Sequence, residues 1–226
     1  METYDLTLLG FSPHAYPMVL EVAAAAWGRQ PAALRVQVIH NLAIDLAPLK
    51  ESMPAEWPAP DAVAMADWAP SERDGALMPG VLREPAVSAV WSAFAEAKSL
   101  QLPQLSTLIH PTASVAPSAT IGPGTWVQPN ATIGTMSRIG ACCHINRNAS
   151  VGHHNTWGHF SRLNPGAHTA GFCQVGQRVT IGLGAVVRES IQIGDGAMVG
   201  AGSVVVKDVA TETMVVGIPA KPLSRS

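Results

Sequence analysis

Between Ile109 and Val205, the sequence places an aliphatic residue at nearly every sixth position. Of the seventeen positions at this spacing, fifteen hold Ile, Val or Leu, and the exceptions are Trp157 and Thr169. A period of six fits neither an amphipathic helix nor an alternating strand. It is typical of a solenoid with short flat faces. Three hexads would then close one triangular coil of about eighteen residues.

The residues around each aliphatic position follow the same period. A small residue often lies four positions later, and Gly or Asn often follows directly. We expect the aliphatic side chains to point inward and stack from coil to coil, a position that suits β-branched residues. We expect Gly and Asn to supply the positive φ that tight corners need. With strands about 4.8 Å apart, five to six coils would give a prism roughly 25–30 Å long.

This repeat resembles that of the hexapeptide-repeat acyltransferases, a family that folds as a left-handed parallel β-helix. The segment "VVGIPAKPL", from Val215 to Leu223, is also similar to the one that follows the last coil in these enzymes. The resemblance implies a mainly β fold, with a left-handed parallel β-helix of about 5–6 coils and acyltransferase function over residues 104–226.

Residues 1–103 predict a small N-terminal α/β domain. Apolar strands are expected within residues 4–10, 33–41 and 61–67, and helices within 16–27 and 84–98. Strands that alternate with helices favour a parallel, Rossmann-like sheet. A Pro-rich stretch from Pro48 to Pro85 obscures the element boundaries there.

The turn "LLGFSPHAY" after the first strand carries a second resemblance. It is similar to the G-x-S-G-H-G turn of the nucleotide-sugar N-acetyltransferases and the sialic-acid O-acetyltransferases, with Pro13 and Ala15 in place of two glycines. In that family the turn holds the substrate, and a helix N-terminus favours phosphate. The implied substrate-binding residues are Gly10, Ser12, Pro13 and His14, to which we add the strand-end residues His40, Asn41 and Asp67.

The segment "VGHHNTWGHFSRLNPGAHTAG", from Val151 to Gly171, matches the family's catalytic stretch in phase. The alignment places His153 on the general base and His154 on the carboxylate beside it, so both are the candidate catalytic residues. Imidazole is the usual general base near neutral pH, and such a base contributes roughly 10²–10⁴-fold to the rate. A neutral His154 is not expected to take over the orienting role of the missing carboxylate.

The resemblance also implies where acetyl-CoA, the expected co-substrate, would bind. The corresponding residues are Arg162, Gly171, Leu183 and Ala201. The acetyl group would pass directly to an amino or hydroxyl group of a sugar or nucleotide sugar. Because Cys142, Cys143 and Cys173 are at or next to small inward positions, we expect them in the core and expect no covalent acetyl-enzyme. The resemblance further implies that this chain forms a homotrimer, with acetyl-CoA in a groove between adjacent prisms.

Two other functions remain open at this point. The γ-class carbonic anhydrases share the prism and bind zinc through three histidines, and the spacing of His154 and His159 matches one pair of their ligands. The remaining ligand would lie near Ser118, where the sequence has no histidine, so no metal is expected. The missing acidic residue and loop glycines also allow a binding or scaffold protein that does not use acetyl-CoA.

Composition excludes several partners. A net charge of −2 gives no electrostatic reason to expect nucleic acid or an acidic membrane surface as a partner. The apolar run "MVLEVAAAAW" is broken by Glu21, which argues against a signal peptide or a spanning helix. Three cysteines without paired spacing favour a reducing compartment, so a cytoplasmic location is expected.

Overall fold

The computed structural model describes residues 3–40, 46, 49, 53–81 and 85–223. The chain divides into two compact units, Met1–Leu108 and Ile109–Ser226. The division falls within β5 (Leu108–Ile109), five residues after the boundary expected from the sequence. In the described part of the chain, neither α-helix has the length and apolar character needed to cross a membrane.

The first unit is built on a parallel four-stranded sheet in the order β3-β2-β1-β4. Its strands are β1 (Leu6–Leu9), β2 (Val36–His40), β3 (Asp61–Ala64) and β4 (Ala76–Pro79). The predicted parallel sheet is confirmed. Strand β4 was not expected, because it lies within the Pro-rich stretch. Proline is tolerated where β4 ends, because this strand is at the edge of the sheet.

Two α-helices of this unit lie within the described ranges. They are α1 (Ala15–Ala26) and α3 (Ala86–Lys98), each within two residues of its predicted bounds. α1 buries Val19, Leu20 and Ala23, and α3 packs against β1 and β4. Short 3-10 turns complete the unit at η1 (Pro31–Ala33), η2 (Glu72–Asp74) and η3 (Leu102–Gln104).

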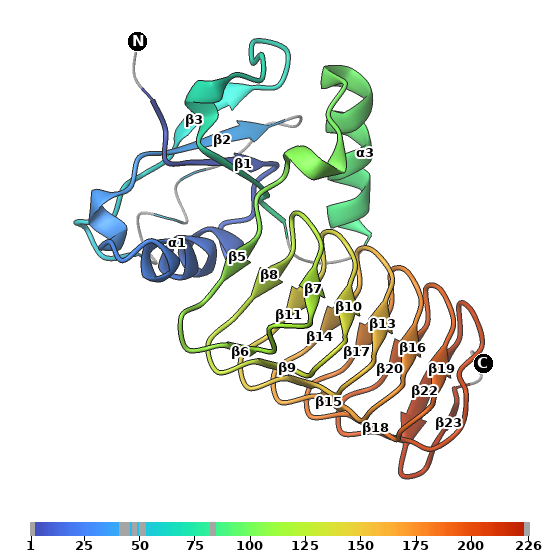
Figure 1. The fold of residues 1–226 in the computed structure, drawn as a ribbon. Coiled ribbons are helices and arrows are strands. Elements are labelled where there is room, and N and C mark those ends of the chain that lie inside the picture. The colour runs from blue at the N-terminus through green and yellow to red at the C-terminus, as the bar shows by residue number, and fades with distance from the viewer. Residues whose placement is uncertain (1–2, 41–45, 47–48, 50–52, 82–84, 224–226) are drawn as a thin grey trace. The chain divides into compact units, whose positions relative to one another are not determined.

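The second unit is a parallel β-solenoid of six turns, as the six-residue period predicted (Figure 1). Its five-stranded face consists of β7 (Thr120–Ile121), β10 (Arg138–Ile139), β13 (Thr156–Trp157), β16 (Gln174–Val175) and β19 (Gln192–Ile193). Its six-stranded face consists of β6 (Ser114–Val115), β9 (Thr132–Ile133), β12 (Ser150–Val151), β15 (His168–Thr169), β18 (Val186–Val187) and β21 (Val204–Val205). Its eight-stranded face consists of β5, β8 (Trp126–Val127), β11 (His144–Ile145), β14 (Arg162–Leu163), β17 (Thr180–Ile181), β20 (Met198–Val199), β22 (Met214–Gly217) and β23 (Ala220–Pro222).

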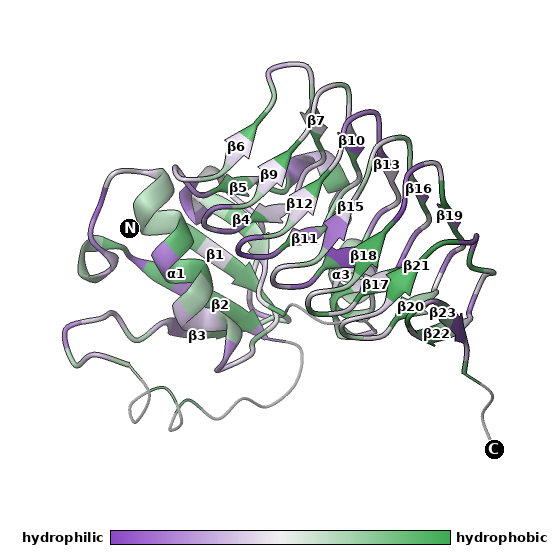
Figure 2. Cartoon of the chain, turned by 90° about the horizontal axis from the view of Figure 1, so that it is seen from below, coloured by the Kyte–Doolittle hydropathy of each residue, from purple (hydrophilic) through white to green (hydrophobic). Residues whose placement is uncertain are grey.

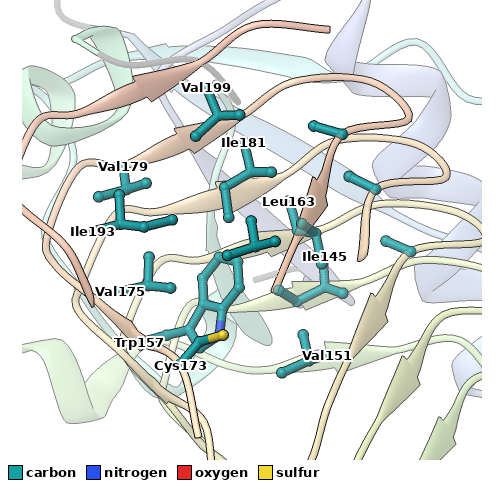
Figure 3. Close-up of a cluster of buried hydrophobic side chains, with 14 of the residues drawn as sticks. Ile145, Val151, Trp157, Leu163, Cys173, Val175, Val179, Ile181, Ile193 and Val199 are labelled. Atoms are coloured by element: carbon teal, nitrogen blue, oxygen red, sulfur yellow. The ribbon is translucent and has the colours of Figure 1, made fainter. Parts of the chain in front are cut away.

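The second residue of each strand from β5 to β21 is the aliphatic position of its hexad. Successive strands of a face pair in a register of eighteen residues, as in Ile139 with Trp157 and Trp157 with Val175. From Val127 onward these side chains are buried and stack along the inside of the prism (Figure 3). Trp157 is 2% exposed, so it is a core residue. Neighbouring coils accommodate its ring with small inward residues such as Cys173, which is also buried.

The glycines that follow the aliphatic positions have a different role from the one expected. They do not adopt positive φ; instead, a Cβ on Gly134 or Gly152 would lie 2.5–2.7 Å from backbone atoms of the next coil. Positive φ occurs two residues later, as at Met136, His154 and Phe172. Glycine is therefore needed for the close approach of adjacent coils, and the left-handed corner residue is often a non-glycine residue.

These left-handed residues form three corners, which we name by one member each. The His153 corner (135–136, 153–154, 171–172 and 189–190) joins the six-stranded face to the five-stranded face. The His159 corner (141–142, 159–160, 177–178 and 195–196) joins the five-stranded face to the eight-stranded face. The Leu183 corner (129–130, 147–148, 165–166, 183–184 and 201–202) joins the eight-stranded face to the six-stranded face.

The surface of the prism is not uniformly polar. Strands β18 and β21 are apolar at both residues, as the hydropathy colouring in Figure 2 shows. Val186 of β18 is 40% exposed and Leu183 at the neighbouring corner is 58% exposed. The late coils therefore present apolar side chains outward on and beside the six-stranded face.

Candidate active site

The two candidate catalytic histidines lie together at the His153 corner, and both are exposed. His154 has the left-handed conformation, with a φ of 56°. Phe172 lies eighteen residues later, at the equivalent position of the next coil, and has a φ of 60°. The side chains of His154 and Phe172 therefore project from the same corner, one coil apart.

The three rings at this corner form a cluster. The Nδ1 atoms of His153 and His154 are 3.1 Å apart, within hydrogen-bond distance. The ring of His154 stacks on Phe172, with centroids 4.9 Å apart, while the ring of His153 stands perpendicular to both. Because a neutral imidazole has one nitrogen that accepts a hydrogen bond, the distance between the two Nδ1 atoms leaves room for a role of His154 that was not expected from the sequence.

The backbone that carries His153 is held from within the prism. Asn155, fully buried, donates from Nδ2 to the carbonyl oxygens of His153 (3.1 Å) and Ala170 (2.8 Å). Ser137 donates from Oγ to the Gly152 carbonyl at 2.7 Å. These side chains fix the corner, so the ring of His153 starts from a well-defined Cα position.

Sequence reasoning missed Phe172, Asn155 and Ser137 as parts of this site. Two signals were present in the sequence. Phe172 follows His154 by one full coil, and Asn155 places a large polar residue where most hexads have a small one.

The other histidines of the prism have different environments. His159 accepts a hydrogen bond on Nδ1 from the Ala141 backbone N–H at 2.8 Å, so it caps the preceding coil. His168 is exposed on β15. His144 is buried and stacks on Trp126 with ring centroids 4.6 Å apart. Burial, with smaller contributions from the positive charges of Arg162 and Arg147, lowers the pKa of His144 to about 3.

The arrangement does not favour the zinc alternative. His154 and His159 lie at different corners, and β13 separates them along the chain. Within the described ranges, no group of three or more His, Cys, Asp or Glu side chains could hold a metal ion. All three cysteines are buried, and burial raises the pKa of the Cys143 thiol to about 12. A neutral buried thiol is a poor nucleophile.

The residues predicted to bind acetyl-CoA lie in three places within one chain. Gly171 is at the His153 corner, directly under the His153 ring. Leu183 and Ala201 are both exposed at the Leu183 corner, one coil apart. Arg162 is half-buried on the eight-stranded face. A single prism therefore does not gather all four residues around His153.

The Leu183 corner has an open edge suited to an extended molecule. Gly166, Gly184 and Gly202 lie on three successive coils, and an added Cβ at any of them would meet no atom within 4 Å. Small residues along this edge leave the backbone accessible to a long, thin ligand such as a pantetheine chain. A separate hollow of about 570 Å³ along β16 and β19 contains none of the predicted acetyl-CoA residues.

In the first unit, the predicted turn lies between β1 and α1. Gly10 has a φ of +77° and donates its N–H to the Ile39 carbonyl at 2.8 Å. Ser12 accepts the Ala15 N–H on Oγ at 3.3 Å, so its side chain helps to begin α1. Pro13 is half-buried and His14 is exposed immediately before the helix. The turn thus combines a left-handed glycine with a helix N-terminus.

The remaining substrate-binding candidates follow other strands of this sheet. His40 ends β2, and Asp67 is exposed in the turn after β3. Because all four strands are parallel, these residues and Gly10 lie at the same carboxyl edge, where ligands of such sheets bind. Asn41 lies outside the described residues. Sequence reasoning missed Gly80 after β4, where a Cβ would overlap the Gly10 carbonyl oxygen.

Comparison with known proteins places this architecture among solved enzymes. No protein-family model and no curated protein matches the sequence. The acetyltransferase domain of PglB from Neisseria gonorrhoeae superposes with a TM-score of 0.78 and 27% identity, over 96% of this chain and 98% of that one. It has also been solved with acetyl coenzyme A. PerB from Caulobacter crescentus, in complex with CoA and GDP-perosamine, gives 0.76 and 26%, over 97% of both chains.

WeeI from Acinetobacter baumannii shares the fold, with a TM-score of 0.76 at 21% identity over 96% of this chain and 100% of that one. The PglB and PerB similarities span both units of the chain, the parallel sheet and the prism alike. The β-solenoid and these neighbours are consistent with a hexapeptide-repeat acetyltransferase. The prediction that this chain is an acetyl-CoA-dependent acetyltransferase is therefore confirmed.

Proposed function

We propose that this chain transfers acetyl from acetyl-CoA to an amino or hydroxyl group of a nucleotide-linked sugar, with His153 as general base. The observation that carries the proposal is similarity at 26–27% identity, across both units, to PglB and PerB. The GDP-perosamine bound to PerB is an amino sugar linked to a nucleotide, which favours an amine acceptor.

The exposed ring of His153 suits the proton transfer that this reaction requires. Its Nε2 would take a proton from the acceptor as the amine or hydroxyl attacks the thioester carbonyl carbon. When the tetrahedral intermediate collapses, the C–S bond breaks and the proton returns to the departing thiolate, releasing CoA as a thiol. The buried cysteines take no part, so the acetyl group passes in one transfer.

The carboxyl edge of the parallel sheet would hold the acceptor. Gly10, Ser12, Pro13 and His14 shape the turn, and α1 begins directly after it, so that the positive end of the helix dipole would favour a phosphate there. His40 and Asp67 lie at the same edge, and Asn41 follows β2 in the sequence. These three residues would contact the sugar or the base of the acceptor. We do not assign uracil recognition.

The acetyl-CoA site would need a second copy of the chain. The His153 corner and the Leu183 corner are separated by the six-stranded face, six residues or about 20 Å wide. A neighbouring prism could bring its Leu183 corner, with Leu183 and Ala201, beside His153 and Gly171. The exposed apolar residues Leu183 and Val186 support burial of this side in a homotrimer. Light scattering should give three times the 23.6 kDa chain mass, and a monomer at micromolar concentration would contradict the trimer.

A mutational test separates this function from a binding or scaffold role. Nucleotide-linked amino sugars, GDP-perosamine among them, would be screened with acetyl-CoA for release of the CoA thiol. With a working acceptor, His153→Ala should lower turnover by at least about a hundredfold, the low end for a lost general base. Acetyl-CoA affinity should change little. Gln177→Ala, at the same hexad position of the His159 corner and exposed, is the matched control. Full activity of His153→Ala would reject the histidine mechanism.

The location of the protein stays a prediction: the cytoplasmic assignment rests on cysteine usage in the sequence alone.

A further inference from the structure

We infer that His154 is a positioning residue for His153, acting as a neutral imidazole whose Nδ1 accepts a hydrogen bond from the Nδ1–H of His153. The inference rests on the proposed function, because it assigns a role to the neighbour of the proposed base. It replaces the carboxylate–histidine pair implied by the sequence resemblance with a pair of imidazoles.

The distance between the two rings carries the first step. Both nitrogens that face each other are Nδ1 atoms, 3.1 Å apart. A hydrogen bond between them requires one proton in total, on one ring or the other. Two neutral arrangements satisfy this condition. Either His153 donates and keeps a lone pair on Nε2, or His154 donates and His153 carries its proton on Nε2.

The proposed role of His153 as general base selects the first arrangement. Its Nδ1 is engaged by His154, so Nε2 is the nitrogen left for an acceptor. The Nε2 edge lies against Gly171, where a Cβ would come within 2.6 Å of this atom. The absence of a side chain there lets this edge of the ring lie against the backbone of the next coil, while the residue as a whole stays exposed. A basic Nε2 therefore requires the proton to be on Nδ1, pointing at His154.

The ring of His154 is held in place to accept this bond. Its backbone N–H donates to the Thr135 carbonyl at 2.8 Å, and the Phe172 N–H donates to the His153 carbonyl at 2.9 Å. These bonds tie three successive coils together at the corner. Phe172 then stacks on the His154 ring at 4.9 Å with an interplanar angle of 23°. His154 therefore has an aromatic support that an exposed histidine normally lacks.

This arrangement also fits the chemical step. When Nε2 of His153 takes the proton from the sugar amine or hydroxyl, the ring becomes an imidazolium and its Nδ1–H becomes a charged hydrogen-bond donor. A hydrogen bond from a charged donor is about twice as strong as a neutral one. His154 keeps its own proton on Nε2 and stays neutral throughout. The pair thus strengthens as the transition state is approached, and relaxes when the proton leaves with the CoA thiolate.

Nitrogen NMR of the ¹⁵N-histidine-labelled full chain tests the tautomers without acetyl-CoA or acceptor. Spectra would be recorded with a metal chelator, at a pH where both rings are neutral, and assigned from His153→Gln and His154→Phe. We expect His153 to be protonated on Nδ1 and not on Nε2, and His154 to show the reverse. In His154→Phe, the tautomer ratio of His153 should shift about tenfold towards Nε2–H, the factor of one net hydrogen bond.

The choice of variants keeps this test interpretable. Phenylalanine is compatible with the left-handed corner, because Phe172 adopts a φ of 60° at the equivalent position. It preserves ring shape and stacking while removing the acceptor. His154→Asn provides the conservative rescue, since its amide oxygen can accept the bond and Asn tolerates positive φ. We expect the Nδ1–H tautomer of His153 to persist in His154→Asn.

Two results would overturn the inference: an Nε2–H tautomer of His153 in the wild type, or a tautomer ratio unchanged in His154→Phe. Neither depends on turnover. If His153→Ala loses activity but the tautomer ratio of His153 is unchanged in His154→Phe, the proposed function stands and only the imidazole pair is rejected. Full activity in His153→Ala would reject the proposed function, whatever the tautomer.

Discussion

The ring of His153 lies over the Cα of Gly171, in the space that a side chain on the next coil would fill. A Cβ on Gly171 would come within 2.5 Å of Cε1 and 2.6 Å of Nε2 of the histidine. Gly171 does not have a positive φ, so its backbone would accept alanine. What this glycine provides is room for the proposed base.

Gly171→Ala should therefore displace the His153 ring with little effect on the fold. A misplacement of about 1 Å can cost on the order of a hundredfold in rate, so we expect turnover to fall by about ten- to a hundredfold. CoA release and the melting temperature would be measured together. Gln177→Ala is the control, since Gln177 is exposed at the same hexad position of the His159 corner. Normal turnover in Gly171→Ala would mean that Nε2 of His153 need not be where the structure has it.

Substitutions at His154 should separate an acceptor from a mere space-filler. We expect His154→Phe to lower kcat by about ten- to a hundredfold, because a hydrogen bond to a charged group contributes about 1.5–3 kcal/mol. KM for acetyl-CoA should stay near the wild-type value. His154→Asp should match or exceed wild-type activity, because a carboxylate accepts the same bond. Equal kcat values in the Phe and Asp variants would argue against a positioning role.

A bulky side chain at the Leu183 corner should block acetyl-CoA. Ala201→Trp would fill the open edge beside Gly202, and we expect calorimetry to show loss of acetyl-CoA binding without a change in the melting transition. Gln177→Trp is the matched control, because Gln177 is exposed at the same hexad position of the His159 corner. If Ala201→Trp binds acetyl-CoA normally, the donor groove lies elsewhere.

Buried His144 should make the protein sensitive to acid. Burial lowers its pKa to about 3, against 6.5 for the ordinary group. Between these values the unfolded chain binds a proton that the folded chain does not, so stability is complete above about pH 6.5 and falls as pH drops towards 3. Between pH 7 and pH 5 this group should remove about 2 kcal/mol. His144→Phe, which can still stack on Trp126, should reduce that loss in denaturant titrations, whereas His168→Phe should not.

The tryptophan inside the prism offers a test of core packing. Trp157→Ala should lower the free energy of unfolding by about 3–5 kcal/mol, because the cavity spans stacked coils. Trp157→Phe should cost much less. The Nε1 atom is buried without a hydrogen-bond partner among the described residues, and its removal relieves a penalty of about 1–3 kcal/mol. A loss for Trp157→Phe as large as that for Trp157→Ala would contradict this prediction.

The period of six was enough to predict the prism because every coil has the same arrangement of inward side chains. An inward aliphatic side chain at Ile139, Val151 or Val175 packs on its equivalent one coil away, so spacing along the sequence maps directly onto spacing in the fold. The same regularity placed His153 and His154 at one corner. In the first unit, β1, β2, β3 and both helices followed from apolar patterning, whereas β4 was hidden among prolines whose effect depends on its edge position in the sheet.

Residue patterns along the chain were sufficient to predict the solenoid, the parallel sheet and the type of residue at the proposed base. How those residues contact one another became visible only in the folded chain. The aliphatic repeat does not reveal that the Phe172 ring stacks on His154 or that Gly171 leaves room for the ring of His153. Nor does it reveal that the side-chain amide of buried Asn155 donates to the Ala170 carbonyl. Each of these contacts joins residues of two neighbouring coils, so it depends on where the side chains point and on how closely the two backbones approach. The physical reason is that hydrophobic periodicity fixes which face of the chain is buried, while hydrogen-bond geometry depends on distances that close only when the coils stack.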